Sequence, residues 1–424
     1  MPEQLRVGIA ITNITPPLGA SLRGYYHERK AEGVHDDLLA KAVWLQAGDE
    51  SAVLVECDLI GLNRDVVAAA RELVEKREKL HAENVMLAAT HTHTGPGVEG
   101  QYAAALAVRI ADAVHMAHRN ARPTRAEIAY GYEDSVCFYR RFRMKDGTVE
   151  TNPGHGNPGV VEPAGEVDPR VAVVGLRADG GAPWALLVNY ALHLDTVGGN
   201  LISADYPFFM GELLRRAVSP DLATVFLQGA AGNINHFDVF GRGSLKGFAE
   251  TQRIGTILAG EVLKCTQKLE PLGTASVRCA RREVRLPVAE VTEHEVAEAR
   301  KILEQPADET KDFTMDRVRA RRAVRLAERH GKPVETELQC IAVGDLAIVG
   351  IPGEPFTELG RAIRDASPLV HTFIVELAND SVGYLPHREA FDEGAYEVES
   401  SRFTPDVGDR IVSEATSLLQ EVAK

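Results

Sequence analysis

The stretch that organises this sequence is Leu87-Ala88-Ala89-Thr90-His91-Thr92-His93-Thr94-Gly95-Pro96-Gly97. An apolar run of small residues, 85–89, leads into it, and Gly-Pro-Gly closes it because no regular element continues through those residues. The pattern predicts a buried strand that carries His91 and His93 at its end. Ligands of open α/β sheets bind beyond the carboxyl ends of strands, so the position indicates a functional site. Imidazoles also serve as turn residues bonded to the backbone, and the pair alone leaves both interpretations open.

Length and charge narrow the class of protein. A chain of 424 residues can bury a large core, as two or three domains or as one large α/β layer structure. Its 47 Lys and Arg against 61 Asp and Glu give a formal charge of -14, which argues against nucleic acid or an anionic membrane surface as a partner. The five cysteines form no C-x-x-C pair, so neither a disulfide framework nor a thiolate zinc site is indicated.

The amino-terminal segment, Met1 to Arg6, has no basic stretch followed by an apolar one. No part of the chain approaches the ~18 consecutive apolar residues of a membrane span. We therefore expect a cytoplasmic protein without membrane insertion.

Strands and helices alternate through most of the chain, and polar or glycine-bearing tips follow the strands. Periodicity predicts strands at 5–14, 42–45, 52–57, 85–89, 126–132, 171–176, 184–190, 223–228, 275–288, 335–343, 346–351 and 371–377, and helices at 63–80, 101–119, 207–217, 249–269 and 406–424. This order is typical of an α/β fold with layered mixed sheets covered by helices and site loops at strand carboxyl ends. We expect one large catalytic domain, 1–424.

Two segments depart from the alternation. Residues 144–168 are rich in Gly and Pro and predict a long irregular loop, for which a substrate lid is the favoured interpretation. Residues 290–330 are charge-rich, helical and broken by Pro306, which favours a solvated helical hairpin on the surface, although an arm for a second subunit or partner is also open.

Chemically capable side chains gather at the predicted strand ends. They are Asp58, His91, His93, His193, Asn233, Glu354 and Tyr384. Neutral imidazoles with a carboxylate are zinc ligands, and catalytic zinc sites keep one position for a water. The chain has no G-x-S-x-G elbow and no H-E-x-x-H helix. In an extended segment residues i and i+2 point to the same side, so His91 and His93 are expected to face one site.

Several motifs together resemble the catalytic domain of the neutral/alkaline non-lysosomal ceramidases. They are the segment from Thr90 to Gly97, Asn189-Tyr190-Ala191-Leu192-His193, Pro352-Gly353-Glu354, and Gly383-Tyr384 followed by Gly394-Ala395-Tyr396-Glu397. They run in the same order along essentially the whole chain. The resemblance implies a zinc-dependent amide hydrolase in which metal-bound water attacks the carbonyl.

The resemblance also implies roles for individual residues. Its metal ligands match His91, His193, Glu354 and Tyr384. The substrate-binding group matches His93 and Arg140, to which we add Asn233 and His236 of the neighbouring turn. The catalytic group is His93, Tyr396 as the contact to the oxyanion, and Asn235 by position.

The turn at Asn235 departs from the family pattern. Ceramidases carry G-[ND]-x-S-P-N there, and this chain has Gly232-Asn233-Ile234-Asn235-His236-Phe237, so an amide stands in place of the serine. An amide is no nucleophile, which confines Asn235 to hydrogen bonding. The family's carboxyl-terminal β-sandwich is not expected here. These departures predict a substrate smaller and more polar than ceramide.

Some residues keep a second interpretation. Glu354 could cap a helix beginning at Pro355, because carboxylates suit helix amino termini. Asp58 could orient a ligand histidine or cap a turn. Arg140 and Arg141 are adjacent, and the sequence leaves open which of them faces the site.

The sequence therefore predicts a cytoplasmic zinc hydrolase acting on a small N-acyl compound, with homo-oligomer formation left open. A zinc-dependent esterase or lactonase for a small polar, sugar-acid-like substrate is the nearest alternative, because the same zinc-activated water serves other carbonyls. A homologue that binds metal or ligand without catalysis is the third hypothesis, and Asn235 is the feature that favours it.

Overall fold

Three sheets form the framework of the computed structural model, which describes residues 4–178, 181–243, 245–306 and 314–424. The first sheet has the order β7-β6-β5-β1-β8, with β1 (Arg6–Asn13), β5 (Leu39–Ala47), β6 (Glu50–Cys57), β7 (Val85–Ala89) and β8 (Arg122–Pro123). The second has the order β17-β15-β14-β9-β19, with β9 (Arg125–Tyr132), β14 (Arg170–Arg177), β15 (Pro183–Tyr190), β17 (Ala223–Gln228) and β19 (Glu270–Pro271). The third has the order β20-β21-β22-β24, with β20 (Val277–Leu286), β21 (Val334–Val343), β22 (Leu346–Gly350) and β24 (His371–Val375).

The inner faces of the three sheets share one hydrophobic core. Val43 of β5, Leu187 of β15 and Ile348 of β22 all belong to it and are almost fully buried. Burying one such side chain contributes about 1.5–3 kcal/mol, so this shared core holds the sheets against each other. The predicted class, layered mixed sheets with covering helices, is confirmed.

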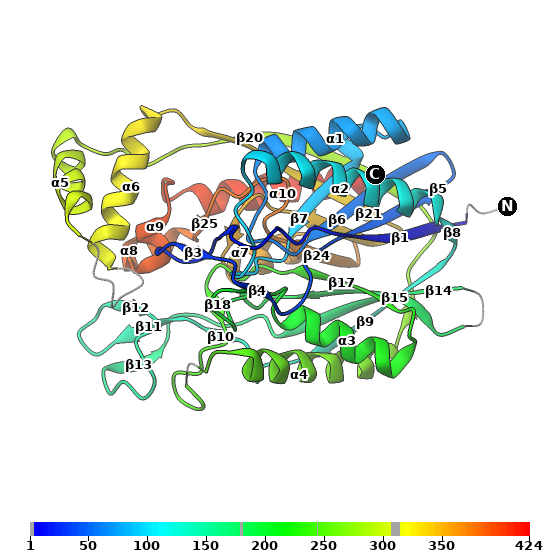
Figure 1. Ribbon diagram of the computed structural model, residues 1–424, viewed down its shortest axis with the longest axis horizontal. Helices are drawn as coiled ribbons and strands as arrows, with labels where there is room; N and C mark the ends of the chain where they lie inside the picture. Colours follow the sequence, from blue (N-terminus) through cyan, green and yellow to red (C-terminus); the bar gives the residue numbers. More distant parts are fainter. Residues whose placement is uncertain (1–3, 179–180, 244, 307–313) are drawn as a thin grey trace.

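Helices cover the outer faces (Figure 1). They are α1 (Arg64–Glu78) and α2 (Gly100–Arg119) on the first sheet, α3 (Tyr206–Val218) and α4 (Phe248–Thr266) on the second, and α7 (Thr357–Asp365) and α10 (Val407–Val422) on the third. Asn63 begins α1, since its side chain accepts a hydrogen bond from the Val66 amide, as its sequence position predicts. No described helix is both long and apolar enough to cross a membrane.

Several short elements connect the sheets and helices. They are β2 (Ser21–Leu22), β3 (Arg29–Lys30), β4 (Gly33–Val34), β10 (Phe138–Tyr139), β16 (Leu201–Ile202), β18 (Ile234–Asn235), β23 (Glu354–Pro355), β25 (Tyr384–Leu385), a 3-10 turn (Ala82–Asn84), α8 (Arg388–Glu393) and α9 (Tyr396–Ser400).

Each large sheet contains one parallel strand pair, and these pairs position the site. The pairs are β6–β7, β15–β17 and β22–β24. His91 follows β7, His193 follows β15, and Glu354 follows β22. Strand β17 of the second sheet contacts β6 and β7 of the first and β24 of the third, so the three chain segments deliver their side chains to a common crevice.

The segment 144–168 is not the irregular loop that its Gly and Pro content predicts. Strands β11 (Arg141–Met144), β12 (Val149–Thr151) and β13 (Val160–Pro163) form a three-stranded antiparallel sheet with β11 in the centre. Backbone pairing with Phe142 and Arg143, which precede the segment, gives it a regular structure. Glycines and prolines occupy the connections between these strands, where turns require them.

The charged segment 290–330 contains the two predicted helices, α5 (Glu293–Glu304) and α6 (Met315–Arg329), while residues 307–313 lie outside the described part. Thr292 and Glu295 form a capping box at the start of α5. The hairpin stands at one end of the molecule, opposite the amino-terminal end (Figure 1). Its second helix packs against α9, which carries Tyr396. The hairpin is thus also a neighbour of the predicted catalytic residues.

A candidate metal centre

Three buried histidines converge on one point. The Nε2 atoms of His91 and His193 lie 3.1 Å apart, those of His93 and His193 also 3.1 Å, and those of His91 and His93 3.4 Å. A neutral imidazole carries one N–H hydrogen, on one of its two nitrogens. Three ring nitrogens that meet in this way therefore cannot all be satisfied by hydrogen bonds to each other. A divalent cation resolves the conflict by accepting their lone pairs. The cluster therefore has the donor chemistry of a metal site.

His91 is held by an unusual backbone conformation. Its φ of 76° lies in the left-handed region, so the segment is not extended as the sequence pattern predicts. Its Nδ1 donates to the carbonyl oxygen of Ile60 at 2.8 Å, which leaves Nε2 without a hydrogen in the neutral ring. His91 and His93 do face one site, but this turn, rather than strand alternation, brings them together.

Glu354 and Tyr384 reach the cluster on a short parallel ladder. Strands β23 and β25 pair these two residues in register, and Glu354 Oε2 lies 3.4 Å from His91 Nε2. The interpretation of Glu354 as a helix cap is wrong, because Glu354 belongs to β23 and α7 begins later, at Thr357. Its carboxylate is thereby left to face the imidazoles.

Burial and charge set the protonation of these groups. Burial lowers the pKa of His93 to about 3, and burial together with the neighbouring His91 lowers the pKa of His193. Burial acts to lower the pKa of His91 as well. The Glu354 carboxylate, together with smaller contributions from Glu376 and Ile60, more than offsets this, so the pKa of His91 lies above its ordinary value. For Glu354, burial raises the pKa and the His91 and Arg140 charges lower it, with a net fall. The ionised Glu354 carboxylate and the neutral imidazoles of His93 and His193 suit a cation, whose binding would displace the proton that His91 shares with Glu354.

Arg140, rather than Arg141, faces the cavity above the cluster. Its Nη2 donates to the carbonyl oxygen of Gly232 at 2.6 Å, its Nε lies 2.7 Å from Glu397, and its guanidinium carbon lies 5.3 Å from the centre of the Tyr384 ring. Arg141 is fully buried, pairs with Glu393 and contacts the other oxygen of Glu397. Of the two arginines, Arg140 is the one among the described residues that line the cavity.

Tyr396 lies beside the metal-site tyrosine. Its ring meets that of Tyr384 edge to face, with centres 5.7 Å apart, and its hydroxyl is 3.2 Å from the hydroxyl of Tyr26. Ala395 precedes it with a φ of 71°, a conformation that L residues rarely adopt. The chain therefore holds Tyr396 at this place against a backbone cost of about 1–3 kcal/mol.

A cavity of about 810 Å³ opens over these groups. Its wall includes Arg140, His93 and His193 from the site, the β12 segment, and Met315 and Arg319 of α6. The sequence did not indicate the part played by α6. Tyr25, Tyr26, Asn152 and Asp195 also line the cavity and were not predicted as site residues. A pair of tyrosines in a polar, glycine-bearing loop was the one available signal for Tyr25 and Tyr26.

The turn that departs from the family pattern lies behind the cavity wall. Asn233 donates to Glu358 and accepts from the Thr357 amide at the start of α7. Asn235 donates to Asn152, and His236 Nε2 donates to the Leu245 carbonyl oxygen. None of these three turn residues is among the described residues that line the cavity. Their predicted roles in catalysis and substrate binding stay predictions.

Asp58 does not contact a metal-site histidine in any described hydrogen bond or ion pair. It accepts from the Leu39 amide at 3.0 Å and lies 3.5 Å from Lys41 Nζ. Ile60 occupies the place of the orienting partner on His91. Of the two interpretations of Asp58, the structure therefore favours the local structural one.

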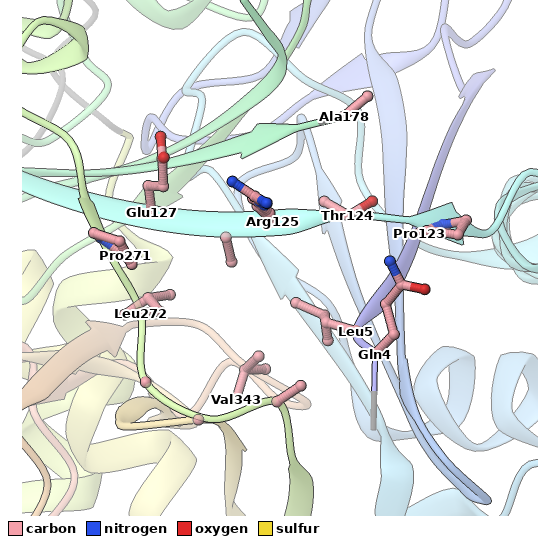
Figure 2. Close-up of a pocket in the computed structure, with 14 residues that line it drawn as sticks. Gln4, Leu5, Pro123, Thr124, Arg125, Glu127, Ala178, Pro271, Leu272 and Val343 are labelled. Atoms are coloured by element: carbon pink, nitrogen blue, oxygen red, sulfur yellow. The ribbon is translucent and has the colours of Figure 1, made fainter. Parts of the chain in front are cut away.

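A second cavity, of about 550 Å³, lies elsewhere in the fold (Figure 2). Leu5, Leu272 and Val343 surround it together with the β8–β9 strand segment. No described histidine or cysteine lines it, and its Glu127 is paired with Arg177 at 2.7 Å. Of these two cavities, the one over the histidine cluster is therefore the candidate functional site.

These observations define an α/β protein with a buried, metal-type histidine cluster at the floor of a cavity. No family model matches the sequence, and no curated protein matches it. Among solved structures, it is similar to neutral ceramidase from Pseudomonas aeruginosa, with a TM-score of 0.78 and 20% identity over 98% of this chain and 74% of that one. It is also similar to a ceramidase complexed with C2, with a TM-score of 0.75 and 17% identity over 98% of this chain and 75% of the other. The chain thus has a neutral ceramidase-like fold.

Proposed function

We propose that the protein is a zinc-dependent hydrolase that cleaves the amide bond of a small, polar N-acyl compound. The observation that carries the proposal is the convergence of His91, His93 and His193 at the floor of a cavity, with the Glu354 carboxylate 3.4 Å from His91. The ceramidase-like fold and the ceramidase-like motifs support the same class of reaction.

The residues present fit a zinc ion. His91 and His193 would hold it through Nε2, with Glu354 through a carboxylate oxygen and Tyr384 through its hydroxyl. Imidazole and carboxylate donors suit zinc, although other divalent ions accept the same set. When bound, zinc supplies Lewis acidity and lowers the pKa of a water molecule toward neutrality.

The protein's own groups would stabilise the substrate carbonyl. The hydroxyl of Tyr396 can donate to an oxygen on which negative charge develops, and the imidazole of His93 lies on the same cavity wall, where it can contact the substrate. Arg140 adds a positive charge that is fixed by Glu397 and the Gly232 carbonyl. Donors that are already held in place lose little freedom as the reaction proceeds.

The cavity wall carries many charged and polar groups, which favours a substrate with polar groups of its own. Carboxylates, hydroxyls, amides and guanidinium groups line it beside tyrosine rings, and the aliphatic side chains among its described lining residues are Val149, Met315 and Ala395. A polar group that is buried without a hydrogen-bond partner costs free energy, so a long alkyl chain that leaves these groups unpaired is disfavoured. We therefore infer that the substrate is an N-acyl compound smaller and more polar than ceramide.

A substrate panel tests this proposal. Zinc-loaded protein is assayed with N-acetyl and N-butanoyl amines that bear hydroxyl groups, with the matched esters and lactones, and with a long-chain ceramide. We expect amine release from the short N-acyl compounds. Preferred cleavage of the lactones would replace the amidase by a lactonase. Absence of any turnover, with zinc firmly bound, would contradict the proposal and favour a non-catalytic binding protein.

A further inference from the structure

Asp195 lies on the cavity wall, facing the side of the His93 ring that points away from the histidine cluster. Its Oδ1 is 3.8 Å from His93 Nδ1, and its side chain is 20% exposed. His93 Nδ1 is buried and has no hydrogen-bond partner. The other ring nitrogen, Nε2, faces His91 and His193. The two nitrogens of His93 therefore have separate surroundings, one a carboxylate and one the metal-type cluster.

Two neighbours hold the Asp195 carboxylate in place. The hydroxyl of Tyr25 donates to Oδ1 at 2.5 Å, and Lys246 Nζ lies 2.7 Å from Oδ2. Lys246 also donates to the Tyr25 hydroxyl at 3.1 Å, which closes a triangle of polar contacts. Charge-assisted hydrogen bonds of this kind are stronger than neutral ones and fix geometry. Asp195 is thus a rigid acceptor rather than a mobile surface carboxylate.

The His93 ring is already confined in its other directions. A Cβ at Gly24 would lie 2.7 Å from the His93 ring, so glycine is required for this close approach. The Tyr25 ring meets it edge to face with centres 5.9 Å apart. Arg29 donates to the His93 carbonyl oxygen. These contacts do not prevent a half-turn of the ring about its Cβ–Cγ bond, which would put ring carbons in the places of the two nitrogens.

We propose that Asp195, held by Tyr25 and Lys246, is a positioning residue that selects the orientation of the His93 ring. A carboxylate facing the Nδ1 edge favours the N–H over the C–H that a flipped ring would present there. Nε2, which carries no hydrogen in this tautomer, is then directed at the cavity floor, where it can accept a hydrogen bond from the substrate. This inference rests on the proposed function, in which His93 contacts the substrate.

The triangle also gives the neighbouring turn a place in the site. Lys246 follows Leu245, whose carbonyl oxygen accepts a hydrogen bond from His236 at 2.9 Å. The ammonium group of Lys246 further lies 5.4 Å from the centre of the Phe237 ring. His236 therefore bonds to the backbone next to Lys246, the lysine that contacts Asp195.

The test compares Asp195→Asn with Asp168→Asn. Asp168 is a matched control because its side chain is also 20% exposed and it is paired, with Arg364 at 2.6 Å, outside the cavity wall. Each variant is measured for zinc content, for kcat and KM on the best substrate of the panel, and for the His93 tautomer by 15N NMR. The His93 signals are assigned by their loss in His93→Gln.

For Asp195→Asn we expect kcat to fall about 10–100-fold with KM and zinc content near their wild-type values. The Nδ1–H signal of His93 should be lost or weakened, and Asp168→Asn should match the wild type in all three measurements. Lys246→Met keeps the carboxylate and should give a smaller fall in kcat. If Asp195→Asn does not fold, the inference is tested by Lys246→Met alone, in which a fall in kcat is expected and an unchanged kcat would contradict the inference.

An unchanged kcat together with an unchanged His93 tautomer would overturn the inference. If the wild type turns over no substrate, the proposed function fails, while the tautomer comparison still reports on the orientation of the ring. Loss of the Nδ1–H signal would then support the Asp195 contact alone, and its retention would reject it.

Discussion

Glu354 and Tyr384 are directly paired on the parallel ladder of β23 and β25, and the Glu354 amide donates to the Gly383 carbonyl oxygen at 3.0 Å. The two strands approach closely because residue 353 is glycine, where a Cβ would lie 2.5 Å from that same carbonyl oxygen. Two proposed metal ligands from different parts of the chain are therefore mechanically joined, so that a displacement of one strand displaces both.

Gly353→Ala should lower zinc affinity, although Gly353 has no metal-binding side chain. The new methyl group must push β25 away from β23, since a backbone oxygen cannot rotate aside as a side chain does. We expect about a tenfold or larger loss of affinity, measured by competition with a chelator. Gly260→Ala is the control, because a Cβ there meets nothing within 4 Å. Equal affinity in both variants would show that the ladder does not set the site.

His193→Ala should abolish zinc binding and turnover together. The ring is buried in the centre of the cluster, with Nε2 at 3.1 Å from both other imidazoles, so no neighbour can replace it. Elemental analysis and the panel assay measure the two effects. His81→Ala, at an exposed histidine paired with Glu75, should retain both. Unchanged zinc content in His193→Ala would remove this residue from the ligand set.

Tyr396→Phe should lower kcat and leave the metal in place. The hydroxyl is proposed to donate to the charged oxygen, and loss of one such donor costs about 10²–10³ in kcat. Zinc content is expected to stay at the wild-type level, and Tyr132→Phe, at a tyrosine that is 62% exposed, serves as the control. A wild-type kcat in Tyr396→Phe would show that the Tyr396 hydroxyl does not stabilise the charged oxygen.

Of the two adjacent arginines, only Arg140 is expected to serve the substrate. Arg140→Ala should reduce kcat/KM, because Arg140 lines the cavity. Both arginines contact the buried Glu397 carboxylate, at 2.7 Å from Arg140 and 3.4 Å from Arg141, so each Ala variant breaks a buried pair, which costs about 3–5 kcal/mol of unfolding free energy. Arg141→Ala should therefore lower stability without changing kcat/KM. Denaturant unfolding and steady-state kinetics on both variants check the division. The reverse pattern would mean that Arg141, not Arg140, serves the substrate.

The sequence predicted the fold class and the convergence of His91, His93 and His193 because strand periodicity and strand-end position are local signals. The left-handed backbone at His91 was not predictable, since Thr-His-Thr reads as extended chain and a tertiary bond to Ile60 decides otherwise. Asp195 was overlooked for a related reason. Its partners Tyr25 and Lys246 come from distant loops, and no spacing in the sequence predicts that these residues contact Asp195.

Removal and return of the metal test the central claim most directly. The purified protein is assayed for amine release from the best N-acyl substrate as isolated, after dialysis against a chelator, and after addition of one equivalent of zinc. We predict that chelation abolishes turnover and that zinc restores it, while His193→Ala stays inactive throughout. Turnover that survives complete removal of the metal would contradict the account.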